Sequence, residues 1–173
     1  TAYYAYMDRY RAVPGDDNAA ATRFTGADNG GGDGIITGLY DAVGGTSAAG
    51  NESNIFWQHT RMAGFMSGTA TDTTALPPIG SAGGTLGIQS QQSAAGGSTY
   101  AMNGPVVCAA SVPWKIAQSV DSQLDNGASD TGNMRAGATL TVATTAATAA
   151  VYGPAVAATA ALEAGIHTLC MQI

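Results

Sequence analysis

A chain of 173 residues is long enough to bury one working hydrophobic core, and a second domain is not expected. With a formal net charge of −6 and Lys115 as its single lysine, the chain lacks the clustered positive charge that binding to nucleic-acid phosphates requires. Because 45% of the residues are hydrophobic but only 7% are aromatic, a few large side chains must anchor a core of small ones. The expected anchors are Tyr3, Tyr6, Tyr10, Phe56, Trp57, Phe65 and Trp114.

The first predicted element is a helix over residues 2–13. Its apolar residues recur at spacings of three and four, which predicts one buried stripe. They are Tyr3, Tyr6, Met7, Tyr10 and Val13. Pro14 should end this helix, and Asp16 or Asp17 should cap a short helix in "NAAATRF". Both aspartates are therefore expected to matter for folding, and the opening in mid-helix suggests that further chain precedes Thr1.

The middle of the chain is predicted to pass from loop to helix to strands. Residues 26–50 are rich in glycine and should form a loop. A helix should follow from Asn51 or Ser53, either of which can cap it, to about Met66. The stretch "TLGIQSQ" predicts a strand over 85–91, and "TYAMNGPVVCAA" predicts another over 99–110, with a turn or bulge at "NGP".

The C-terminal third is predicted to contain one helix and at least one strand. "SVPWKIAQSVDSQLDNG" suits a helix with Ile116, Val120 and Leu124 on one face, four residues apart. "ATLTVATTA" favours a strand, whereas composition cannot choose a structure for the alanine-rich residues 146–164. The final "GIHTLCMQI" should be a strand or an extended segment. The whole chain is thus expected to belong to the α+β class.

The first of two acidic stretches that could hold a cation is "DNGGGDG". Asp28 and Asp33 lie there beside flexible glycines, as calcium ligands do. However, an EF-type register places Gly31 at a ligand position and Tyr40 where the bidentate glutamate belongs. A solvated turn is therefore the simpler interpretation.

The second acidic stretch, "VDSQLDNGASDTG", contains Asp121, Asp125 and Asp130. Asp121 and Asp125 are four residues apart on one predicted helix face, where like charges repel unless a cation or Arg135 lies between them. The alternative is a helix-to-loop turn with local hydrogen bonds. Calcium at either stretch is a hypothesis, and no other cofactor is indicated.

Two cysteines, Cys108 and Cys170, stand in apolar surroundings and have no zinc-site or CxxC spacing. Two interpretations remain open. They are either buried free thiols or a structural disulfide, and the disulfide would place the protein outside the cytoplasm.

Catalysis finds little support in the sequence. His59 and His167 have no serine or cysteine motif beside them, and GxSxG, HExxH and P-loop motifs are absent. A structural or surface role is the better interpretation of both histidines. A structural or binding protein is therefore expected rather than an enzyme.

Several segments, in order, resemble the type IV pilin-like proteins, which are made from prepilins with an N-terminal cleavage and methylation signal. These are "AYMDRYRAVPGDDNAAATRF", a Gly/Asp-rich loop, "ESNIFWQHTRMAGFM", "GGTLGIQS" and "IAQSVDSQLDNGASDTGNMRAG". The resemblance touches about half of the chain. In "LDNG", the branch of the family more often has two aspartates, which argues against a cation there.

The resemblance implies an N-terminal amphipathic helix packed on an antiparallel sheet, with extra short helices and long loops. Residues 1–13 would be the remnant of a long helix whose missing apolar half anchors the precursor in the inner membrane, and residues 14–173 would form the headgroup. A disulfide between Cys108 and Cys170 would tie down the C-terminal region, as in many pilins.

The function that the resemblance implies is that of a non-catalytic structural subunit, a major or minor pilin, in an extracellular type IV pilus or related filament. Its partners would be other pilin subunits and the inner-membrane assembly machinery. Alternatives are a pseudopilin of a type II secretion system, in the periplasm, and a binding or adhesion subunit at the pilus tip.

Overall fold

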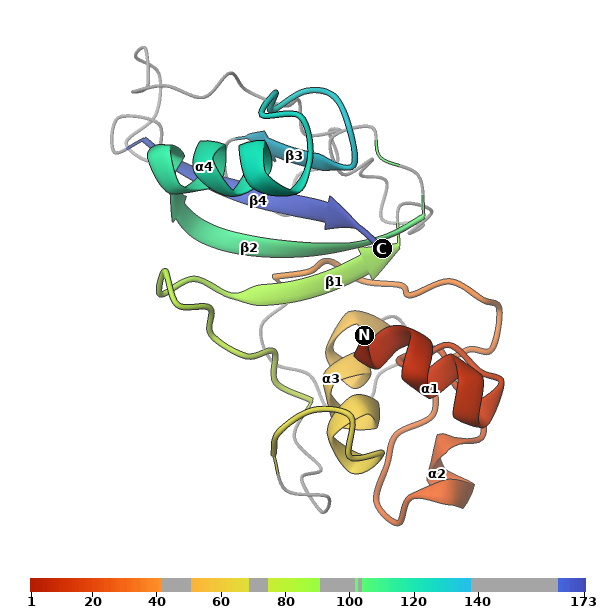
Figure 1. Cartoon of the computed structure of the whole chain (residues 1–173). Coiled ribbons are helices and arrows are strands. Elements are labelled where there is room, and N and C mark those ends of the chain that lie inside the picture. The colour runs from red at the N-terminus through yellow and green to blue at the C-terminus, as the bar shows by residue number, and fades with distance from the viewer. Residues whose placement is uncertain (42–50, 69–74, 91–101, 103, 138–164) are drawn as a thin grey trace.

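A computed structural model describes residues 1–41, 51–68, 75–90, 102, 104–137 and 165–173. Within these ranges the chain is α+β, as the sequence predicts, with helices and strands in mixed order along it (Figure 1). The helices are α1 (Ala2–Tyr10), α2 (Ala20–Arg23), α3 (Glu52–Met62) and α4 (Trp114–Leu124). The strands are β1 (Leu86–Ser90), β2 (Pro105–Pro113), β3 (Met134–Gly137) and β4 (Ile166–Gln172). None of the described helices is long and apolar enough to cross a bilayer.

The four strands form one antiparallel sheet in the order β1-β2-β4-β3. Figure 1 shows α4 lying across the sheet, while α1, α2 and α3 form a separate helical group beyond β1. The core between α4 and the sheet consists of small and medium side chains, as the composition requires. It contains Val112, Ala117, Met134, Ala136 and Leu169.

A disulfide joins the two central strands. Cys108 of β2 and Cys170 of β4 are register partners, and their side chains are fully buried. Of the two interpretations that the sequence leaves open, the structure therefore has the disulfide. It lies in a cluster with Tyr40, Met102 and Val106.

The expected packing of the N-terminal helix on the sheet needs correction. Helix α3 makes the main helical contact with β1, and α1 packs on α3. Tyr6 is the fully buried residue of α1, while Tyr3 reaches the edge of an apolar cluster shared by α3 and β1. That cluster contains Ile36, Phe56, Trp57 and Ile88.

Helix α1 also ends earlier than predicted, at Tyr10 instead of Val13. Arg11 adopts the left-handed conformation, with φ 56°, and its N–H donates to the Met7 carbonyl. This is the geometry of a helix C-cap, so the chain turns before Pro14 is reached.

Both edges of the sheet are covered by loops. On β1, the Leu86 N–H donates to the Pro78 carbonyl at 2.9 Å, and the Ser90 N–H donates to the Ile36 carbonyl at 3.1 Å. The Tyr40 carbonyl oxygen lies so close to Gly87 that any Cβ there would collide with it. On β3, the Ala136 N–H donates to the Ser129 carbonyl. Neither edge of the described sheet is left as a template for pairing with another strand.

The apolar face predicted for the helix at 111–127 is correct only for Val120, which packs against the core between α4 and the sheet. Residues 111–113 continue β2 after a bulge, and on α4 the side chains of Ile116 and Leu124 are 53% and 67% exposed. Ala117 and Asp121 are buried instead. The Asp121 carboxylate accepts the Gly127 N–H at 2.9 Å, which holds this side of the helix inward.

Of the remaining predicted elements, some are confirmed and others lie outside the described residues. The strands predicted at 85–91 and 165–173 are present as β1 and β4, and the strand predicted at 99–110 is present from Pro105 as β2. The sequence did not predict β3. The strand-prone stretch 138–146 and the alanine-rich residues 146–164 lie outside the described residues.

Replacing both cysteines with alanine should lower the free energy of unfolding by about 2–4 kcal/mol. The cysteines are 62 positions apart, so the unfolded chain regains much conformational freedom when the bond is absent. Urea denaturation of the wild type and the double variant measures the difference. Reduced wild type should resemble the variant, and a variant as stable as the oxidised protein would contradict the prediction.

Candidate functional site

The Asp16 carboxylate, in the turn that follows α1 (residues 13–16), organises the glycine-rich loop, a name used here for residues 28–37. Its side chain is buried, and it accepts three successive backbone N–H groups. Oδ1 accepts from Gly32 at 2.5 Å and Asp33 at 3.1 Å, and Oδ2 accepts from Gly34 at 2.6 Å. A single carboxylate thus satisfies a run of donors that has almost no side chains to pack.

Glu52, in the first turn of α3, binds the same loop at two places. Its Oε1 accepts the Gly31 N–H at 2.6 Å, and its Oε2 accepts both the N–H and the hydroxyl of Thr37 at 2.8 Å. The carboxylate is also well placed near a helix N-terminus, where the dipole favours negative charge. Asp16 and Glu52 together therefore fix residues 31–37 on α3.

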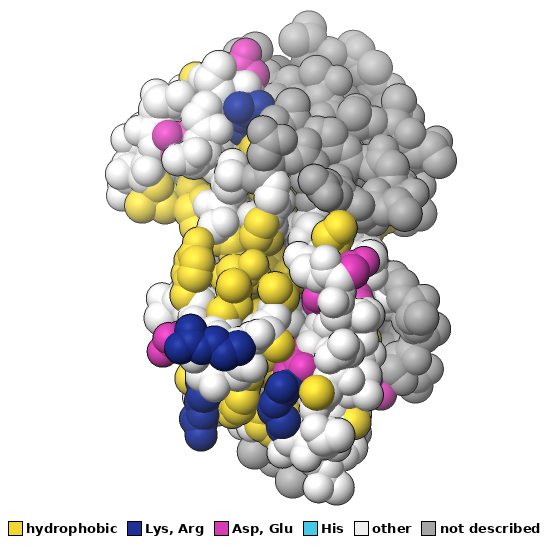
Figure 2. Space-filling model, turned by 90° about the vertical axis from the view of Figure 1, so that its right-hand side faces the viewer, with side chains coloured by type: hydrophobic (Ala, Val, Ile, Leu, Met, Phe, Trp, Pro, Cys, Tyr) yellow, Lys and Arg dark blue, Asp and Glu magenta, His cyan; other side chains and the backbone are white. Residues whose placement is uncertain are grey.

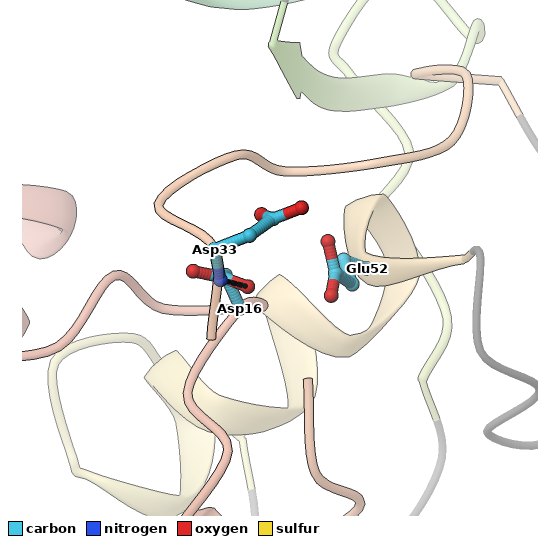
Figure 3. A group of neighbouring side chains, drawn as sticks. All are labelled: Asp16, Asp33 and Glu52. Atoms are coloured by element: carbon cyan, nitrogen blue, oxygen red, sulfur yellow. Dashed lines mark hydrogen bonds between the residues drawn. The ribbon is translucent and has the colours of Figure 1, made fainter. Parts of the chain in front are cut away.

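Asp33 completes an acidic cluster, a name used here for Asp16, Asp33 and Glu52. Figure 3 shows the three side chains facing one another from the turn, the loop and the start of α3. Each offers a carboxylate oxygen, and these oxygens lie within 4.8 Å of one another. Burial raises the pKa of the Asp16 carboxyl above its ordinary value, and the charge of Glu52 adds to this effect, whereas the three N–H donors oppose it.

The acidic cluster could offer three oxygens to a cation, and calcium usually takes six to eight. All four oxygens of Asp16 and Glu52 already accept hydrogen bonds from the protein. The structure places Asp33 in this cluster but leaves Asp28 out of it. The Gln58 side chain engages Asp28 instead, accepting its N–H at 2.9 Å. Calcium at this stretch stays a prediction.

The second acidic stretch is not brought together as a three-carboxylate group in the part of the chain that the structure describes. Asp121 accepts the Gly127 N–H, and Asp125 accepts the Met134 N–H at 2.9 Å. Asp130 is exposed. Here two of the three predicted ligands hold the loop between α4 and β3, which matches the alternative of a turn with local hydrogen bonds.

Asp17, beside Asp16, ties α1 to α2. Its Oδ2 accepts the Tyr6 hydroxyl at 2.8 Å and forms an ion pair with Arg23, and its Oδ1 accepts the Ala19 N–H at 2.9 Å. Burial alone would raise the pKa of the Asp17 carboxyl, but the bonds from Ala19, Tyr6 and Arg23 hold it below its ordinary value. The predicted capping role is wrong, because the N-cap of α2 is Ala19 and no side chain caps this helix. Asp17 instead anchors Tyr6 and Arg23.

His59, in the middle of α3, bridges the turn and the loop. Its Nδ1 accepts the Gly15 N–H at 2.9 Å, and its Nε2 lies 2.8 Å from the Asp28 carbonyl. The ring stacks on that of Tyr6, with centroids 5.8 Å apart. His167 is buried in β4, on the other side of β1 from this network. His59 therefore has a structural role, which is to join the turn and the loop to α3.

Sequence reasoning missed Glu52 and His59 as members of one site with Asp16. One signal was available. Residues 30–34 contain four glycines, so their N–H groups must be satisfied by acceptors from elsewhere, and buried carboxylates are strong acceptors.

Comparison of the chain with family models, curated proteins and solved structures finds no match.

Substituting Asp16→Asn should lower the free energy of unfolding by about 1–3 kcal/mol, because the amide nitrogen would face the Gly34 N–H and leave it unpaired. Asp33→Asn is the matched control. It removes a charge from the exposed member of the acidic cluster and should change stability by no more than about 0.5 kcal/mol. Chemical denaturation at neutral pH compares the two, and equal losses would contradict the assigned roles. A loss in Asp33→Asn that appears only with added calcium would support a cation.

Asp17→Asn should cost stability in a pH-dependent way. Because the folded state lowers the pKa of Asp17, its contribution is complete above the ordinary value of about 3.9 and disappears as the pH falls through the folded value. The difference from wild type, about 1–3 kcal/mol near neutrality, should therefore shrink in acid. Denaturation curves from pH 7 to pH 3 test this, and a difference that grows in acid would contradict it.

Proposed function

We propose that this chain is a structural, non-catalytic subunit of an extracellular filament of the type IV pilus kind. The sequence resemblance supports the proposal. This resemblance rests on segments that occur in a given order along the chain. Three of them are bonded to one another in the structure: the α1–α2 segment, the glycine-rich loop and α3. Their polar residues serve to hold these segments together, which suits a protein that transmits force.

The observation that carries the proposal is the attachment of the end of α1 to α3. Tyr6 is fully buried and bonded to Asp17, and the turn after α1 is bonded to His59 through Gly15. From α3, apolar contacts lead to β1, and backbone pairing then leads to β2 and β4 with their disulfide. A pull along α1 would thus be distributed into the sheet.

The outer face of α1 offers a surface for neighbouring subunits. Tyr4 is 58% exposed, and the face is hollowed by an open apolar depression of about 510 Å³. The depression is lined by Tyr4, Met7, Asp8, Arg11, Ala12 and Val13. Figure 2 shows hydrophobic side chains gathered across the middle of the described surface, with Lys and Arg side chains below them. Apolar surface of this kind is typical of contacts between proteins.

Deleting the gene should abolish or shorten surface filaments, as seen by electron microscopy, and the wild-type gene should restore them. Secreted enzymes are assayed in the same strains, because loss of secretion with normal pili would indicate the pseudopilin alternative. The coding sequence upstream of Thr1 should specify a short basic leader, a glycine and an apolar helix. A cleavable secretory signal in that place would overturn the proposal.

Complementation with Tyr4→Asp tests the outer face of α1. This variant should fold but fail to restore filaments, since it puts a charge into the apolar depression. Ile116→Asp on α4 is the control, because Ile116 has nearly the same exposure, 53% against 58% for Tyr4. Filaments restored equally by both variants would exclude the α1 face as the contact surface.

A further inference from the structure

The His59 side chain is bonded to both the turn after α1 and the glycine-rich loop. The turn supplies the Gly15 N–H, at 2.9 Å from Nδ1, and the loop supplies the Asp28 carbonyl, at 2.8 Å from Nε2. The imidazole is fully buried, and its bond to Asp28 involves the main chain and not the carboxylate.

These partners fix the protonation state of the ring. A backbone N–H can only donate, so Nδ1 must carry a lone pair, and a carbonyl can only accept, so Nε2 must carry the hydrogen. His59 is therefore a neutral imidazole protonated at Nε2 in the folded protein. A second proton has one place to bind, which is Nδ1.

A proton on Nδ1 would point directly at the Gly15 N–H. Two donors would then face each other in a buried site, and the Gly15 N–H would lose its acceptor. Gly15 has little room to rotate its N–H away from the ring, because its Cα packs against the backbone of α3. A Cβ there would come within 2.6 Å of the Glu52 carbonyl oxygen, and its φ is +93°.

We infer that His59 is an acid-sensitive latch: protonation of Nδ1 releases the turn 13–16 from α3 and from the glycine-rich loop, which Glu52 and Gln58 continue to hold on α3. Release of the turn also breaks its backbone bonds to the loop. The Gly30 N–H donates to the Asp17 carbonyl, and the Gly32 N–H donates to the Asp16 carbonyl, both at 2.9 Å. This inference rests on the geometry of His59 and not on the proposed function.

Charged groups around the ring set the direction of the response. Burial lowers the pKa of His59 below its ordinary value, and Arg23 of α2 adds to this. The bond to the Asp28 carbonyl and the carboxylates of Asp17 and Asp28 oppose the shift without reversing it. From α1, Tyr6 faces the ring as a neutral phenol whose pKa is raised by burial and by Asp17. On α3 itself, Glu52 lies seven positions before His59, towards the same side of the helix.

The sign follows from linkage. In the released state the ring has its ordinary pKa of about 6.5, so the released population should rise about tenfold per pH unit below that value, until the pKa of the closed state is reached. Asp16 acts in the opposite direction, since its pKa is raised in the closed state. Asp17 favours release only below its ordinary pKa of about 3.9.

Amide hydrogen exchange by NMR between pH 7.5 and pH 4.5 tests the latch on the wild-type protein. After correction for intrinsic exchange, the protection of the Gly15, Gly32 and Gly34 amides should fall about tenfold per pH unit below about pH 6.5. The amides of Cys108 and Leu169, in the central strands, should keep their protection. An equal fall in those strands would mean global unfolding and would overturn the inference.

His59→Asn provides the matched variant, because the asparagine oxygen can accept the Gly15 N–H but does not titrate. The fall in protection towards acid should vanish, whatever the level of protection, and any slope that remains should have the opposite sign, from Asp16. His167→Asn, which removes the other histidine, should leave the slope of the Gly15 amide unchanged. A direct NMR titration of wild type should give His59 a pKa below its ordinary value. A normal or raised pKa, or an unchanged slope in His59→Asn, would overturn the inference.

Discussion

The described helical group depends on one constraint: the N–H groups of a loop made almost wholly of glycine must find buried acceptors. Residues 30–34 have few side chains with which to bury apolar area, so packing cannot hold them. Two carboxylates do so instead, Asp16 from the turn and Glu52 from α3. Charged acceptors form stronger hydrogen bonds than neutral ones, which offsets the cost of burying them. The course of the loop, and through it the position of the turn, follows from these bonds.

This constraint also accounts for the unusual burial of α3, all of whose residues are buried. Phe56 and Trp57 pack in the apolar cluster with Ile88 of β1. The polar residues Glu52 and His59 would normally face water, but the turn and the loop cover them and are bonded to them. A helix with two different partners needs both kinds of face, and an amphipathic pattern alone reveals just the apolar one.

The sequence was sufficient where local rules decide. Apolar periodicity located α1 and α3, β-branched runs located β1 and β2, and the C-terminal strand was confirmed. It failed where distant partners decide. The four-residue strand β3 exists because β4 pairs with it, and on α4 Asp121, bonded to the following loop, is buried while Leu124 is exposed. The acidic cluster joins residues 36 positions apart, between Asp16 and Glu52, so the spacing rules for a calcium loop in "DNGGGDG" could not find it.

The resemblance to pilin-like proteins rests on separate segments in a given order. In this chain the first three segments are chemically interdependent: Asp16 needs the loop donors, the loop needs Glu52, and Gly15 needs the His59 acceptor. Losing one partner would leave buried donors or acceptors unsatisfied on the others. Segments that are so coupled should be retained or lost together, whatever machine they serve. Their joint presence therefore counts as one coupled feature of the fold and not as three independent matches.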